Sequence, residues 1–141
     1  MDEIGKNISI LYRQLNLFLN HELEGTDITA TELMYLASLY EKDGVTQDDL
    51  VQEYCIDKAA TARTIQGMEK KGLITRQTSS TDKRAKIVCL TQKANAYVAL
   101  IRQIQRKWVN EINVDLTEEE MRIFTHVLAA ATQKAKKINQ D

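Results

Sequence analysis

The sequence predicts a mainly α-helical fold with a small β-hairpin, arranged as a winged helix-turn-helix between helices at both chain ends. Residues 57–72 form a helix-compatible run that stops at Gly72, and two β-prone runs follow, 73–77 and 85–90, around a polar loop with an Asp-Lys-Arg tip. This order places a helix suited to a major groove beside a hairpin that can reach the DNA backbone. Residues 55–93 carry nine Lys or Arg and three acids, a net +6, whereas the whole chain carries −1. A basic patch confined to one part of a near-neutral chain is typical of a surface that binds nucleic acid.

Length and composition predict one domain, residues 1–141, with the winged helix-turn-helix at about 29–92 and helical dimerisation parts at 1–25 and 91–141. The chain has 43% hydrophobic and 28% charged residues, five glycines and no proline, which favours helices with short connections. It has no apolar run long enough for a membrane span and no basic-then-apolar leader at its start, so we expect no membrane partner and a cytoplasmic location.

Capping patterns mark the helix starts. An apolar stripe from Ile4 to Leu23 predicts a first helix of about 20 residues that ends at Gly25. Thr29 with Glu32, and Thr46 with Asp49, predict the starts of a second and a third helix. Asp57 caps the fourth.

The fourth helix has two faces. Its packed side carries Thr61, Thr64, Ile65 and Met68. The opposite side carries Lys58, Ala59, Ala62, Arg63, Gln66 and Lys70. Gly72 after two lysines is a well-formed stop, because cations suit the negative helix end and glycine accepts a positive φ.

Two further helices are expected near the carboxyl end. Thr91 caps a long one with an apolar stripe from Tyr97 to Ile112, running to about Asn113, or roughly 34 Å at 1.5 Å per residue. Thr117 with Glu120 opens the last one. These stripes and that of the first helix exceed what a small winged-helix core can cover. A larger monomeric core would explain them, but we favour a dimer interface, since two-fold symmetry also suits paired half-sites on DNA.

The run from DKAATARTIQGMEKKGLITR through STDKRAKIVCLT, with helices on both flanks, resembles the multiple antibiotic resistance regulators (MarR family) of bacteria and archaea. The Lys-Lys-Gly-Leu turn and the Asp-Lys-Arg tip followed by Leu90-Thr91 are the most specific parts, and the order of six helices around one wing covers nearly the whole chain. The resemblance implies a homodimeric transcriptional regulator, usually a repressor, that binds a pseudo-palindromic double-stranded DNA operator. Such proteins release DNA when a small ligand binds or a cysteine is oxidised.

The expected DNA-contacting residues lie on the third and fourth helices and the wing: Thr46, Lys58, Ala59, Ala60, Ala62, Arg63, Gln66, Lys70, Lys83, Arg84 and Lys86. The alternative for this basic run is a solvated charged face without a ligand, and Arg63 could instead pair with an acid and hold the fold. By resemblance, Asp82 orders the wing. Family members often carry polar residues where this chain has Ala59, Ala60 and Ala62. Alanine can touch a thymine methyl but cannot donate to a base edge, so the wing and DNA shape would carry more of the specificity.

Release is expected to depend on a small-molecule effector, with Tyr12, Tyr35 and Trp108 as candidates to line its cavity, although aromatic packing explains each of them alone. The alternative is a thiol sensor using Cys55 or Cys89, where Lys86 and Arg84 could lower the pKa of Cys89. Sensors of this family carry their reactive cysteine in the first helix, and this chain has none before Cys55.

No cofactor, metal site or enzyme activity is expected. His21 and His126 stand alone, without partner ligands at suitable spacing. The sequence has no GxSxG, no HExxH and no phosphate-binding glycine loop, and its acids are dispersed. A winged helix used as a protein-interaction module, without DNA, is the remaining rival. Steep salt dependence of duplex binding would separate it from a regulator.

Overall fold

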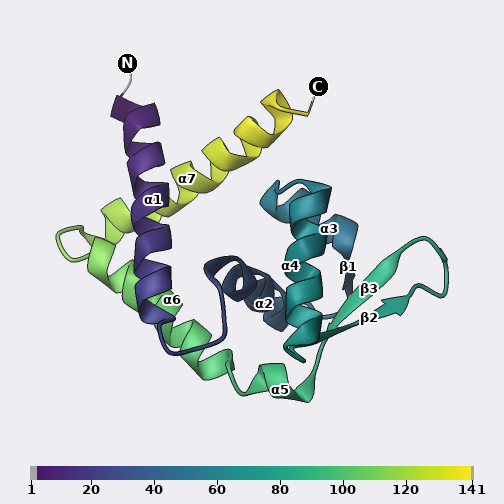
Figure 1. Ribbon diagram of the computed structural model, residues 1–141. Helices are drawn as coiled ribbons and strands as arrows, with labels where there is room; N and C mark the ends of the chain where they lie inside the picture. Colours follow the sequence, from purple (N-terminus) through teal and green to yellow (C-terminus); the bar gives the residue numbers. More distant parts are fainter. Residues whose placement is uncertain (1–2, 141) are drawn as a thin grey trace. The chain divides into compact units, whose positions relative to one another are not determined.

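The computed structural model describes residues 3–140 and has the predicted fold class, mainly α-helical with one small antiparallel sheet (Figure 1). Residues 1, 2 and 141, which belong to the predicted terminal segments, lie outside the described residues. Within the described range the elements are α1 (Glu3–Glu22), α2 (Ala30–Glu41), β1 (Val45–Thr46), α3 (Gln47–Tyr54), α4 (Lys58–Lys70), β2 (Ile74–Thr78), β3 (Lys86–Leu90), α5 (Gln92–Asn95), α6 (Val98–Ile112) and α7 (Glu118–Ile138).

The chain divides into two compact units, Met1–Gln105 and Arg106–Asp141. The first contains α1 to α5, the sheet and the beginning of α6. The second contains the end of α6 and all of α7. The winged helix-turn-helix therefore lies wholly within the first unit.

The predicted caps form at the helix starts. Thr29 and Glu32 make a reciprocal capping box at α2, and Thr117 and Glu120 make one at α7. The box at α3 also forms: the Thr46 hydroxyl accepts from the Asp49 amide at 3.0 Å, and the Thr46 amide donates to the Asp49 carboxylate at 2.9 Å. Aspartate thus replaces the usual glutamate at this position without loss of either bond.

The long helix predicted after Thr91 is wrong in one respect, because it is broken into α5 and α6 around Ala96 and Tyr97. In a continuous helix the Ala94 carbonyl would accept from residue 98. Here it accepts from the Tyr97 amide at 3.1 Å and from the Tyr40 hydroxyl at 2.6 Å. A tertiary hydrogen bond from α2 therefore accompanies the tighter turn, and the described residues form seven helices instead of six.

A third strand, β1, was not predicted. The sheet order is β1-β3-β2, with Val45 opposite Val88 and Arg76 also opposite Val88 on the other side of β3. Asp43 supports this edge, since its carboxylate accepts from the Leu90 amide at 2.9 Å. A two-residue strand has too little sequence to show a period of two.

The core of the first unit lies between α2, α4 and the sheet. Its fully buried side chains include Tyr35, Leu36, Leu50, Ile65 and Val88. The Tyr35 hydroxyl lies 3.2 Å from the Thr61 hydroxyl, which gives both buried polar groups a partner and joins α2 to α4. This core fixes the side of α4 that faces inward, and so the side that faces solvent.

Candidate nucleic-acid interface

The packing of one face of α4 in the core determines which of its residues are exposed. Asp57 caps the helix, with its carboxylate accepting from the Ala60 amide at 2.8 Å. Thr61, Ile65 and Met68 are buried. The residues predicted to contact DNA turn outward in consequence: Lys58, Ala59, Arg63, Gln66 and Lys70 are exposed, while Ala60 and Ala62 are half-buried. The periodicity read from the sequence therefore gives the correct faces of α4.

Arg63 is available to a ligand of α4. In the part of the chain that the structure describes, its side chain makes no ion pair, so the alternative that it holds the fold through an acid has no partner there. Lys58 differs, because its ammonium lies 3.8 Å from the Asp48 carboxylate, with both side chains exposed. An ion pair as exposed to solvent as this one is weak, so a phosphate can readily replace the Asp48 carboxylate as the partner of Lys58.

The wing is a hairpin with an ordered tip, and its loop extends away from α3 and α4 (Figure 1). Asp82 accepts from the Arg84 amide at 3.0 Å, and the Arg84 Nε lies 3.4 Å from the same carboxylate oxygen. Ser79 closes the loop with its amide, which donates to the Ala85 carbonyl at 3.0 Å. Lys83 is exposed at the tip, and Lys86 donates to the Thr78 hydroxyl at 3.0 Å. Asp82 therefore orders the loop at the tip, and the Lys83 and Arg84 side chains there are exposed to solvent.

Three of the nine basic residues counted in the sequence, Lys71, Arg76 and Lys93, bond to other parts of the molecule, Lys93 by donating to the Lys71 carbonyl at 2.5 Å. Lys71 donates to the buried carboxylate of Glu32 at 2.7 Å and to the Asp27 carbonyl at 2.5 Å. Arg76 makes two bonds to Glu69, at 3.0 and 3.3 Å. The cations that remain for a polyanion are those on the outer face of α4 and on the wing.

Sequence reasoning missed Glu32, Glu69 and Gln47 as partners in this region. Glu69 and Arg76 are seven residues apart across a turn, and Glu32 and Lys71 are 39 apart. Spacing along one helix could not have predicted these pairs. The contact of Glu69 with Arg76 depends on the turn between α4 and β2, and that of Glu32 with Lys71 depends on the packing of α4 against α2.

The expected lowering of the Cys89 pKa is wrong. Burial raises the pKa of this half-buried thiol, and the nearby Asp43 carboxylate raises it further. Both effects disfavour the thiolate that reacts with oxidants. Cys55 is exposed and forms the C-cap of α3 with a positive φ of 55°.

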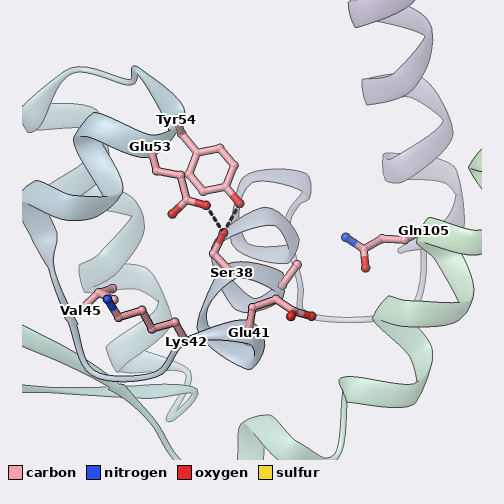
Figure 2. A pocket seen from close by; sticks show the side chains of 8 residues that line it. Ser38, Glu41, Lys42, Val45, Glu53, Tyr54 and Gln105 are labelled. Carbon is pink, nitrogen blue, oxygen red and sulfur yellow. Dashed lines mark hydrogen bonds between the residues drawn. The ribbon is translucent and has the colours of Figure 1, made fainter. Parts of the chain in front are cut away.

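A cavity of about 440 Å³ lies beside α2 and α3, but its walls differ from those expected. It is lined by Ala37, Ser38, Glu41, Lys42, Val45, Glu53, Tyr54 and Gln105. Figure 2 shows the Ser38 hydroxyl between the Glu53 carboxylate, 2.8 Å away, and the Tyr54 hydroxyl. Burial is the main cause of a raised Tyr54 pKa.

The three aromatic residues proposed for a ligand cavity do not line this one. Tyr35 is fully buried and its ring packs against that of Tyr54, with centroids 5.4 Å apart. Tyr12 is 66% exposed on α1, and Trp108 is half-buried at the end of α6.

Within residues 3–140, no group of three or more His, Cys, Asp or Glu side chains could hold a metal ion. No helix in that range is both long and apolar enough to cross a membrane.

Comparison with known proteins agrees with this geometry. The model of the MarR family matches residues 28–86. A MarR transcriptional regulator from Methanosarcina mazei Go1 is 30% identical over 98% of this chain and 99% of that chain, with a TM-score of 0.91. A SlyA-like transcription regulator from Listeria monocytogenes is 25% identical over 97% and 91% of the two chains, also with a TM-score of 0.91. A MarR family protein from Listeria monocytogenes, solved in complex with a 26mer DNA, has the same identity, coverage and TM-score.

Proposed function

The chain belongs to the MarR family of winged helix-turn-helix transcriptional regulators, and we propose that it binds a pseudo-palindromic DNA operator as a homodimer. The observation that carries this proposal is the outer face of α4, where Arg63 and Gln66 stand exposed on a helix whose other face is locked into the core. The Listeria relative in complex with a 26mer DNA supports a duplex as the ligand.

The two reading elements have different chemistry. Arg63 and Gln66 can bond bidentately to base edges, guanine for arginine and adenine for glutamine. The alanines of α4 can add contact with thymine methyl groups. Lys83 and Arg84 at the wing tip are suited to phosphates or to a narrow minor groove, which position the protein and read DNA shape. Thr46, whose hydroxyl already caps α3, is suited to a backbone contact beside that helix start.

Dimerisation is supported by the apolar side chains left exposed in each unit. In the first unit, Ile4 is 76% exposed and Ile8 is 56% exposed on α1. In the second unit, α7 has no buried residue and exposes Ile123, Phe124, Val127 and Leu128. Faces of this kind are typical of interfaces between subunits. A two-fold dimer would present two α4 helices to two half-sites.

We propose that this dimer is a repressor, released by a small ligand in preference to cysteine oxidation. The raised pKa of Cys89 supports this preference. The cavity beside α2 and α3 offers hydroxyl and carboxylate groups to a ligand. A ligand shifts DNA affinity only by its differential affinity for the two dimer states, so a ligand indifferent to them would release nothing.

The rival function is a protein-interaction module that keeps the fold without binding DNA. Affinity for a random-sequence duplex, measured from low to high salt, separates the two. A regulator loses affinity with a log–log slope of about −0.9 for each phosphate that it neutralises, so several phosphate contacts give a steep line. Absence of binding at low salt, or a flat slope, would support the interaction module instead.

A further inference from the structure

One guanidinium joins three elements of the winged helix-turn-helix. Arg76, in the middle of β2, donates from Nε and Nη2 to the two oxygens of Glu69 on α4, at 3.3 and 3.0 Å. Its remaining terminal nitrogen, Nη1, donates to the Gln47 side-chain oxygen at 3.3 Å, at the first residue of α3. We refer to Arg76, Glu69 and Gln47 as the three-element bridge.

The bridge occupies the guanidinium in a way that a lysine could not. The paired bonds to Glu69 use the planar fork of arginine, and the third bond leaves in another direction. The Arg76 side chain is 26% exposed and that of Glu69 is 40% exposed. The hydrogen bonds and charge of Arg76 hold the pKa of Glu69 below its ordinary value, so this carboxylate stays ionised at neutral pH.

The bridge sits where the direction of the wing is set. β2 pairs with β3 at all five of its positions, from Ile74 with Leu90 to Thr78 with Lys86. The two strands of the hairpin are therefore paired along the whole of β2, so a contact to one strand bears on the placement of both. Arg76, at the middle of β2, is tied by its side chain to both helices of the helix-turn-helix, to Glu69 of α4 and to Gln47 of α3.

We propose that Arg76 is a positioning residue for DNA specificity: through Glu69 and Gln47 it holds the wing at a fixed spacing from the recognition helix α4. This inference rests on the proposed function. If α4 and the wing already have their bound arrangement, DNA binding costs no further conformational entropy for ordering them. If the wing is loose, it must be ordered on binding, and this cost lowers the affinity. The loss is confined to a duplex that α4 and the wing must contact in one register. A random duplex lets each element find phosphates separately.

The test uses the full chain and two duplexes: one that the wild-type protein enriches from a random pool, and a shuffled version with the same composition. The variants are Arg76→Gln, Arg76→Lys, Glu69→Gln and the exchange Glu69→Arg with Arg76→Glu. Arg102→Gln, which removes one exposed cation from α6 outside the reading elements, is the charge-matched control. Urea unfolding of each variant sets the folded fraction used in the comparison.

We expect Arg76→Gln, Arg76→Lys and Glu69→Gln each to reduce the preference for the selected duplex about tenfold, the middle of the range for residues in one hydrogen-bond network. The salt slope of Arg76→Gln should equal that of the wild type. The exchange should restore most of the preference, since Gln47 can donate to a carboxylate as well as accept, and Arg102→Gln should change nothing.

Two results would overturn the inference. Equal loss on both duplexes in Arg76→Gln, with a salt slope about one unit shallower, would make Arg76 a phosphate contact. An unchanged preference in every variant would mean that backbone and core packing alone hold the wing. If the wild-type protein enriches no duplex, the proposed function fails and takes this inference with it, a result distinct from the other two.

Discussion

Arg63 and Lys83 are two exposed cations with different surroundings, one on a rigid helix and the other at a loop tip. If Arg63 reads a base, Arg63→Ala should cost about 1–3 kcal/mol and relax preference at one base pair in each half-site. Lys83→Ala should weaken binding to all duplexes alike and flatten the salt slope. Titrations on a selected and a shuffled duplex measure both effects. Equal losses on the two duplexes for both variants would remove the assignment of base reading to Arg63.

The two cysteines should differ in reactivity. Cys55 is exposed, whereas burial and the Asp43 carboxylate raise the pKa of Cys89 and keep it as a neutral thiol. Mass spectrometry of iodoacetamide alkylation at neutral pH should therefore find Cys55 modified first. Neither thiol is expected to control DNA release.

The control for that expectation is Cys55→Ser combined with Cys89→Ser, assayed for duplex binding with and without peroxide. We expect the wild type and the double variant to keep their affinity alike. Release of the wild type alone would establish thiol sensing and reverse our preference for a ligand.

At the residue scale the sequence predicted the outward side chains of α4 well, because a 3.6-residue period and a strong core decide them. It could not predict which cations have internal partners. Lys71 reaches Glu32 because α4 packs against α2, and Arg76 reaches Glu69 because the chain turns at Gly72, where φ is +75°. A count of charges treats such residues as free.

Among the elements, the contact between α2 and the α5–α6 break can be tested through Tyr40. Tyr40→Phe removes the donor to the Ala94 carbonyl and should cost about 1 kcal/mol of unfolding free energy near neutral pH. Urea unfolding measures this. An unchanged urea midpoint would show that the Tyr40 hydroxyl does not stabilise the contact between α2 and the α5–α6 break.

The same variant has a pH signature. Burial raises the pKa of Tyr40 to about 12, above its ordinary value of 10.0. A raised folded-state pKa gives stability that is fully present below the unfolded pKa and lost as pH rises through the folded one. The wild type should therefore lose more stability than Tyr40→Phe between about pH 10 and about pH 12. Parallel losses would mean that Tyr40 titrates as in the unfolded chain.

Element types and caps were predictable because each start has a local signal, as at Thr29, Thr46 and Thr117. The break between α5 and α6 could not be predicted, because residues 93–97 contain neither glycine nor proline. The Ala94 carbonyl accepts instead from the Tyr40 hydroxyl of α2, a tertiary contact. Strand β1 was missed for a similar reason, since its pairing with β3 is tertiary.

For the whole molecule, light scattering at micromolar concentration should give a mass of about 32 kDa, twice the 16.1 kDa of the chain. Ile8→Asp places a charge on the exposed apolar face of α1 and should shift the protein toward monomer. Asn20→Asp places the same charge at an exposed polar position about 120° around α1 from Ile8 and is the matched control. A monomeric wild type would remove the dimer and weaken the palindromic operator with it.

The central claim is that two copies of α4 read two half-sites. Pull-down of fragmented genomic DNA with the wild-type protein, in the presence of competitor DNA, tests it most directly. The account predicts enriched fragments that share an inverted repeat, with half-sites about 10 bp apart, because a two-fold dimer presents its helices one DNA turn apart. Recovery of no inverted repeat, with no enrichment over competitor, would contradict it.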